Sequence, residues 1–250
     1  MMLPLLLLAA MPDTGPPAPT LEARFNKCVD LATRDPDAAA AEAGRWQLAG
    51  GGSLARQCLG IAYANSERWA AAAAEFEGAA HAAEIAKNPR AALYWAQGGN
   101  AWLAAKEPVK ARAALDAALA AGTLTGLDRG EAYLDRARAQ VAGGQLEGAR
   151  VDIDQALVDA PADPLAWLLS ATLARKMDDL PRAKKDIAEA LKRSGDDAAV
   201  QLEAGNIAAL GGDADGAKAA WRQAASIAPD SAVGKNAQTA LAQFDTVAKP

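Results

Sequence analysis

The chain repeats a pattern of small and bulky residues at a spacing of 34 positions. In three successive stretches an alanine, a bulky residue and a second alanine recur at the same offsets. These residues are Ala149, Ile153 and Ala156, then Ala183, Ile187 and Ala190, then Ala217, Trp221 and Ala224. Self-similarity at this period predicts an array of stacked helical units, each of which needs its neighbours to bury its apolar face.

The composition favours many thin helices over one thick core. Hydrophobic residues make up 51% of the 250 residues, but aromatic residues only 5%. Alanine supplies most of the apolar count, and it is the best helix former although it is too small to fill a thick core. The net charge of −5 argues against nucleic acid as a partner, because phosphate binding requires a basic stripe and the sequence has none.

Five windows can be aligned at this period, at residues 53–86, 92–125, 130–163, 164–197 and 198–231. In each window position 8 is small, positions 20 and 27 are alanine, and position 24 is bulky. The first window, for example, has Gly60, Ala72, Phe76 and Ala79 at these positions. The pattern resembles the tetratricopeptide repeat, a unit of two antiparallel helices. This resemblance implies an all-α solenoid, a right-handed superhelix of antiparallel helix pairs.

The flanking segments complete the predicted array. Residues 20–52 resemble a degenerate helix pair closed by three glycines, and residues 232–250 predict a capping helix and a tail.

The first two windows are followed by spacings of 39 and 38 residues instead of 34. Because Asn88-Pro89 is typical of a helix start, we expect the extra residues to lengthen the first helix of the second unit. Residues 122–126 predict a longer loop.

Residues 1–19 combine a short apolar run, from Met1 to Met11, with a Pro/Gly-rich leader. A run of this length cannot span a bilayer, but it matches the hydrophobic region of a secretory signal peptide. No lysine or arginine precedes the run, so a cytosolic leader is the alternative. The first interpretation predicts a periplasmic or secreted protein and the second a cytoplasmic one. Neither predicts an integral membrane segment.

The two cysteines, Cys28 and Cys58, fall on the first helices of adjacent predicted pairs, where they could face each other. In an oxidising compartment a disulfide between them would stabilise the weak N-terminal pair by about 3–4 kcal/mol. The alternative is two buried, unpaired thiols in a reduced protein.

The sequence offers little for catalysis, and we expect no enzyme, no cofactor and no metal. His81 is the one histidine, and the chain has no CxxC motif. The motifs GxSxG, GxGxxG and GxxxxGK[ST] are absent. The glycine- and aspartate-rich stretch 211–216 fails as a calcium loop, because Gly211 and Arg222 would occupy its two end ligand positions.

The resemblance also implies where a partner binds, since in this family the first helices of successive units line a concave groove. The candidate groove residues are Leu93, Asn100, Leu134, Arg138, Leu165, Leu168, Leu169, Thr172, Leu202 and Asn206. Their leucines predict a largely apolar strip, which suits an amphipathic helix or an apolar peptide. Alternatively, the curvature of the array or an intramolecular segment covers these leucines.

The hypothesis that follows is a non-catalytic interaction scaffold whose partner is another protein or a peptide. Family members that grip the C-terminal carboxylate of chaperones use lysine and asparagine in the groove. Asn100 stands at one such place but the lysines are missing, so that clamp is not predicted. Two alternatives remain: a structural subunit of a larger envelope assembly that uses its convex or end faces, and a regulator that responds to oxidation of Cys28 and Cys58.

Overall fold

The computed structural model describes residues 20–247, and every regular element in that range is a helix. The thirteen helices of this range are α1 (Leu21–Arg34), α2 (Pro36–Leu48), α3 (Gly52–Asn65), α4 (Trp69–Ile85), α5 (Ala91–Ala104), α6 (Pro108–Ala120), α7 (Gly126–Ala142), α8 (Leu146–Asp159), α9 (Pro164–Lys176), α10 (Leu180–Ser194), α11 (Ala198–Leu210), α12 (Ala214–Ile227) and α13 (Ala232–Val247). The predicted signal peptide at 1–19 and the last residues of the predicted tail, 248–250, lie outside the described range.

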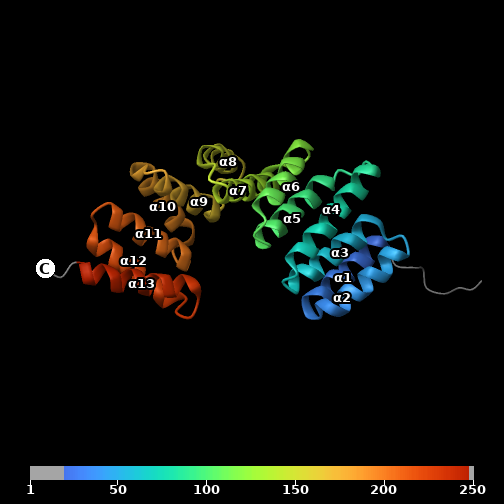
Figure 1. The fold of residues 1–250 in the computed structure, drawn as a ribbon, viewed down its shortest axis with the longest axis horizontal. Helices are drawn as coiled ribbons and strands as arrows, with labels where there is room; N and C mark the ends of the chain where they lie inside the picture. Colours follow the sequence, from blue (N-terminus) through green and yellow to red (C-terminus); the bar gives the residue numbers. More distant parts are fainter. Residues whose placement is uncertain (1–19, 248–250) are drawn as a thin grey trace, which may run out of the picture.

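Consecutive helices pack as antiparallel pairs, and each pair stacks on the next to form an arch (Figure 1). The helices α6, α8 and α10 run along the outer side of the arch, and α7 and α9 lie inside them. At the C-terminal end α13 covers both α11 and α12. The prediction of an all-α solenoid with a C-terminal capping helix is confirmed. None of the helices between residues 20 and 247 has the length and apolar character needed to cross a membrane.

Several helices begin where the sequence predicts, because an aspartate caps the first turn. Asp35 accepts a hydrogen bond from the backbone N–H of Ala38 at 3.0 Å, and Asp163 accepts one from Leu165 at 2.9 Å. Each aspartate precedes a proline at the first helical position, where no backbone donor is needed.

The expectation for Asn88-Pro89 is wrong. The extra residues before the second unit extend α4, which has 17 residues, and α5 begins only at Ala91. The alanine-rich stretch of α4 has a high helix propensity and continues until Lys87 turns the backbone at a positive φ of 52°. Asn88 then caps the following turn by accepting a hydrogen bond from the N–H of Arg90 at 3.0 Å.

Within each repeat unit, a small residue on the first helix faces a bulky residue on the second helix. A Cβ added to Gly60 would lie 2.7 Å from the Phe76 ring, and Cβ atoms on Gly99 and Gly205 would overlap Leu115 and Trp221 in the same way. The third and fourth units have the pairs Ala137 with Ile153 and Ala171 with Ile187. The pairing lets two backbones approach closely while one large side chain fills the remaining space.

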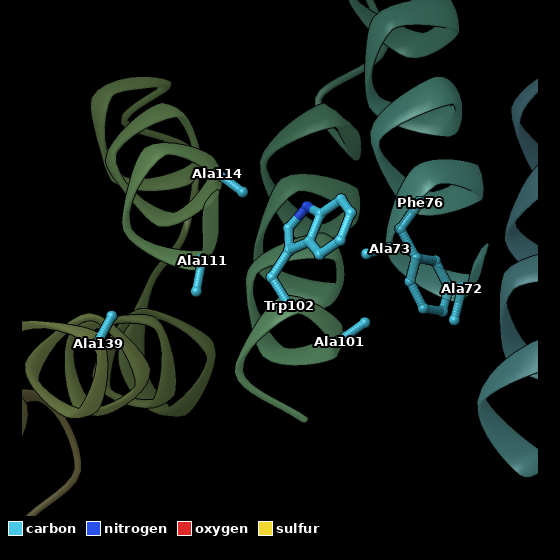
Figure 2. Packing of buried hydrophobic residues seen from close by; sticks show 8 residues of the cluster. All are labelled: Ala72, Ala73, Phe76, Ala101, Trp102, Ala111, Ala114 and Ala139. Atoms are coloured by element: carbon cyan, nitrogen blue, oxygen red, sulfur yellow. The ribbon is translucent and has the colours of Figure 1, made fainter. Parts of the chain in front are cut away.

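Alanines pack at the contacts between neighbouring helices, as the cluster around Trp102 shows (Figure 2). The indole of Trp102 on α5 lies between Ala73 and Phe76 of α4 on one side and Ala111 and Ala114 of α6 on the other. Its Nε1 donates to Glu77 at 2.7 Å, which satisfies the polar edge of a ring that is 8% exposed.

Partly buried ion pairs add polar links between the units. The guanidinium of Arg136 on α7 donates to both oxygens of Asp152 on α8, at 2.7 and 2.8 Å, and to Asp116 on α6 at 2.9 Å. These hydrogen bonds raise the pKa of Arg136 above its ordinary value. Arg175 on α9 makes the equivalent two-pronged contact with Glu203 on α11, at 2.6 and 3.1 Å.

The two ends of the array are closed in different ways. At the N-terminal end a disulfide joins Cys28 on α1 to Cys58 on α3, with the two Cα atoms 6.2 Å apart. Both cysteines are buried next to Ala43 and Leu59. At the C-terminal end Phe244 of α13 packs edge-on against Trp221, with ring centroids 5.4 Å apart. The end helices therefore gain support that a middle unit receives from a neighbour on each side.

The contacts of the glycines predict opposite effects for two Gly→Ala substitutions. Gly205→Ala gains helix propensity but forces the new methyl group into Trp221, so we expect a loss of about 1–3 kcal/mol in the free energy of unfolding. Gly44→Ala in α2 meets nothing within 4 Å and should gain up to about 1 kcal/mol. Chemical denaturation of both variants tests this, and a stabilised Gly205→Ala variant would contradict it.

Candidate functional site

The inner side of the arch is made by the first helices of successive pairs. Helix α5 lies against α7 and α9 lies against α11, while α6, α8 and α10 lie on the outer side (Figure 1). Two depressions interrupt this inner face. One lies at α4, α5 and α7, and the other at α7, α8 and α9. Helix α7 contributes to both.

The first depression, which we call the acidic hollow, has a volume of about 410 Å³. Trp69 and Phe76 from α4 and Leu93 from α5 give it an apolar lining. Its opposite wall is one face of α7, which presents three carboxylates at the helical spacing i, i+3 and i+7: Asp128, Glu131 and Asp135. The hollow therefore combines an apolar side with an acidic one.

The three carboxylates differ in how they are compensated. Asp135 accepts a hydrogen bond from the side-chain amide of Asn100 at 2.7 Å and pairs with Arg138 at 2.8 Å. Asp128 and Glu131 have no hydrogen-bond or ion-pair partner among the side chains that the structure describes. Partial burial, helped by the charges of Asp128, Asp135 and Asp163, raises the pKa of Glu131 above its ordinary value.

The second depression, which we call the apolar slot, is smaller, at about 140 Å³. Val141, Ile153, Leu169 and Leu173 contribute most of its lining. Thr172 and the cationic side chains of Arg138 and Lys176 complete the lining. A volume of this size accommodates one aliphatic side chain and no larger ligand.

Across residues 20–247 no three His, Cys, Asp or Glu side chains are grouped so that they could hold a metal ion. His81 is exposed on α4, 3.2 Å from Glu84 and edge-on to the Trp95 ring, and it lines neither depression.

Comparisons with known proteins identify the architecture. No protein-family model and no curated protein matches the sequence. The solved structure of PilW, a type IV pilus biogenesis factor, matches with 21% identity and a TM-score of 0.70, covering 87% of this chain and 98% of PilW. YrrB, a TPR protein with an unusual peptide-binding site, matches with 16% identity and a TM-score of 0.56, covering 78% of this chain and 96% of YrrB.

A chain of the hetero-tetramer Cut9–Hcn1 from the APC/C matches with 16% identity and a TM-score of 0.70. The match covers 91% of the present chain but only 43% of that one, so this chain spans less than half the length of that relative. The chain has the tetratricopeptide-repeat (TPR) fold. Helices α3 to α12 form five successive pairs, flanked by α1 and α2 at one end and α13 at the other.

The structure gathers some of the predicted groove residues and separates others. Leu93 and Asn100 line the acidic hollow, and Arg138, Leu169 and Thr172 line the apolar slot. Leu165 is 46% exposed at the start of α9. Leu168 packs against the core around Ile187, Leu202 packs against the core around Trp221, and Asn206 accepts a hydrogen bond from Trp221 at 3.1 Å.

The prediction is wrong for Leu134, which is only 2% exposed and belongs to the core with Ala166 and Leu173. It occupies position 5 of its TPR unit, and position 5 lies where the next unit covers the first helix. Leu168 and Leu202 stand at the same position and are half-buried. The predicted continuous apolar strip is therefore replaced by two separate depressions.

Some lining residues of the acidic hollow were missed for identifiable reasons. Asp128 precedes position 1 of its unit, which is residue 130. Helix α7 begins at Gly126, a full turn before that position. Trp69 and Phe76 come from a second helix, whereas the prediction considered only first helices. The signal that could have found Asp128 is the spacing of 38 residues between the second and third units.

The raised pKa of Glu131 predicts a pH-dependent effect of Glu131→Gln. Above the raised folded-state pKa the charged carboxylate costs stability, whereas below the unfolded-state pKa Glu131 is protonated in both states and the cost disappears. We expect the variant to gain about 0.5 kcal/mol or less at neutral pH, since the side chain is exposed, and nothing in acid. Thermal denaturation against pH tests this, with Glu147→Gln on α8 as a charge-matched control. An equal gain in acid would contradict the electrostatic explanation.

Proposed function

We propose that the chain is a non-catalytic protein–protein interaction scaffold that holds a peptide or an amphipathic helix of a partner on the inner face of the TPR array. The observation that carries the proposal is a pair of open, partly apolar depressions, the acidic hollow and the apolar slot, which lie next to each other along α7. A preformed surface of this kind binds by burying a few anchor side chains without the cost of ordering itself. The peptide-binding site of YrrB, which has the same fold, supports a similar use here.

The absence of an enzymatic role is part of the same proposal. The inner face offers carboxylates and amides, but its depressions are open to solvent along the arch and enclose no reacting centre. Catalysis of most reactions requires a nucleophile or acid–base pair held in a site that excludes water. The chain would therefore act by holding a partner and not by changing it.

An extracytoplasmic location is also proposed, and the disulfide supports it. Such bonds persist in oxidising compartments and are rare in the cytosol. Both sulfurs are buried, at 3% exposure for Cys28 and 0% for Cys58, which favours a structural bond over a redox-responsive one. The relation in fold to PilW, a pilus biogenesis factor, is compatible with this location.

The location predicts the oxidation state of the cysteines in the native host. We expect Cys28 and Cys58 to resist alkylation in freshly lysed, denatured cells until a reductant is added. Mass spectrometry of the two cysteine-containing peptides measures this directly. Complete alkylation without reductant would place the protein in a reducing compartment and contradict the proposal.

The binding face can be tested by crosslinked affinity capture from the native host. We expect Leu169→Glu, which puts a charge into the apolar slot, to reduce the captured partner by about tenfold or more. Val158→Glu on α8 is the matched control, because it adds the same charge at an exposed valine outside both depressions. Circular dichroism must show both variants to be folded.

Equal capture by wild type and both variants would contradict binding through the slot. It would favour the alternative of a subunit that docks through its outer face. That face carries Val109 on α6 and Val151 and Val158 on α8, which are 82%, 67% and 74% exposed.

A further inference from the structure

The acidic hollow differs from the buried acidic sites of the molecule in the balance of its charges. Three buried carboxylates are each matched by an arginine: Asp152 by Arg136, Asp159 by Arg129 and Glu203 by Arg175. In the hollow, Asp135 is matched by Arg138, which leaves Asp128 and Glu131 without a partner among the described residues. Two carboxylates on one turn of α7 therefore present net negative charge to the cavity.

The carboxylates of the hollow act on one another. The charges of Asp128 and Asp135 disfavour the charged form of Glu131 and raise its pKa, so a cation placed among them would relieve this repulsion. Opposite them, Trp69 and Leu93 provide an apolar surface within the same cavity of about 410 Å³. A ligand that fills the hollow must satisfy both sides at once.

Only some chemistries meet this requirement. An acidic peptide would add to the repulsion already present, and nucleic acid would be repelled for the same reason. A bare metal ion would leave the apolar side empty, and the described carboxylates are not grouped as metal ligands. A lysine or arginine side chain fits, because its hydrocarbon stem covers apolar surface while its charged end reaches the carboxylates. The Trp69 ring offers a cation a further favourable contact.

We propose that the acidic hollow selects a cationic and apolar segment of the partner, with a lysine or arginine directed at Asp128 and Glu131 and an adjacent aliphatic side chain on Leu93 and Trp69. This inference rests on the proposed function, because it specifies the chemistry of the peptide that the inner face holds. It is opposite in sign to a clamp for a peptide carboxylate, which needs cationic groups at this place.

The test uses three fluorescein-labelled peptides of equal length and the full chain. The first peptide alternates lysine and leucine, the second has glutamate in place of lysine, and the third has serine in place of leucine. We expect fluorescence anisotropy to show tightest binding of the lysine–leucine peptide and weaker binding as salt is added. The serine peptide should bind more weakly because it leaves the apolar side uncovered.

Variants that neutralise the carboxylates of the acidic hollow test whether the peptide binds there. Asp128→Asn combined with Glu131→Gln should weaken binding of the lysine–leucine peptide by about tenfold. The matched control combines Asp196→Asn with Asp230→Asn, which changes the net charge equally at exposed positions outside the hollow. We expect the control to bind the peptide as wild type does. An equal loss in both double variants would show nonspecific attraction and overturn the inference.

The remaining outcomes separate this inference from the proposed function. If the glutamate peptide binds as tightly as the lysine peptide and Leu169→Glu abolishes its binding, the charge selection is wrong but peptide binding on the inner face stands. If none of the three peptides binds, the inference falls. The capture experiment with Leu169→Glu and Val158→Glu then decides the proposed function independently.

Discussion

The whole array depends on one steric match, the contact between a small residue on the first helix of a unit and a bulky one on the second. Where position 24 is Phe76, Leu115 or Trp221, position 8 is glycine, and where it is isoleucine, position 8 is alanine. This match sets how closely the two helices of a unit approach. Every unit uses it, so the pairs have similar shapes and can stack in a regular arch.

That regularity also determines where binding chemistry can lie. The second helices and one side of each first helix are used in packing against neighbouring helices. The inward-facing side of the first helices is therefore the surface that remains available to a partner. The acidic hollow forms where the repeat spacing is irregular, because the extra turn at the start of α7 brings Asp128 beside Glu131. An irregularity in an otherwise repeated chain thus supplies a feature that the repeated positions lack.

The sequence predicts the fold well because the repeat is expressed in residues that pack locally. The alanines, glycines and bulky residues that set the period are the ones found in the core, and aspartate–proline pairs locate two helix starts. The binding face is predicted less well. Whether Leu134 or Leu169 is accessible depends on how far the next unit covers each first helix, and the lining by Trp69 depends on the curvature of the array. Neither quantity is a local property of the sequence.

The contrast between the two closed ends has a consequence for the order in which the array comes apart. Each unit contacts mainly its neighbours, so loss of structure begins at an end and moves inward. A covalent bond holds α1 to α3, whereas α13 is held by noncovalent contacts, among them the packing of Phe244 on Trp221. We therefore expect the oxidised chain to open from its C-terminal end, so that the units around the acidic hollow are lost after those that follow them and before the disulfide-linked N-terminal helices. Reduction of the Cys28–Cys58 disulfide removes this difference between the two ends, so that the array can open from either one.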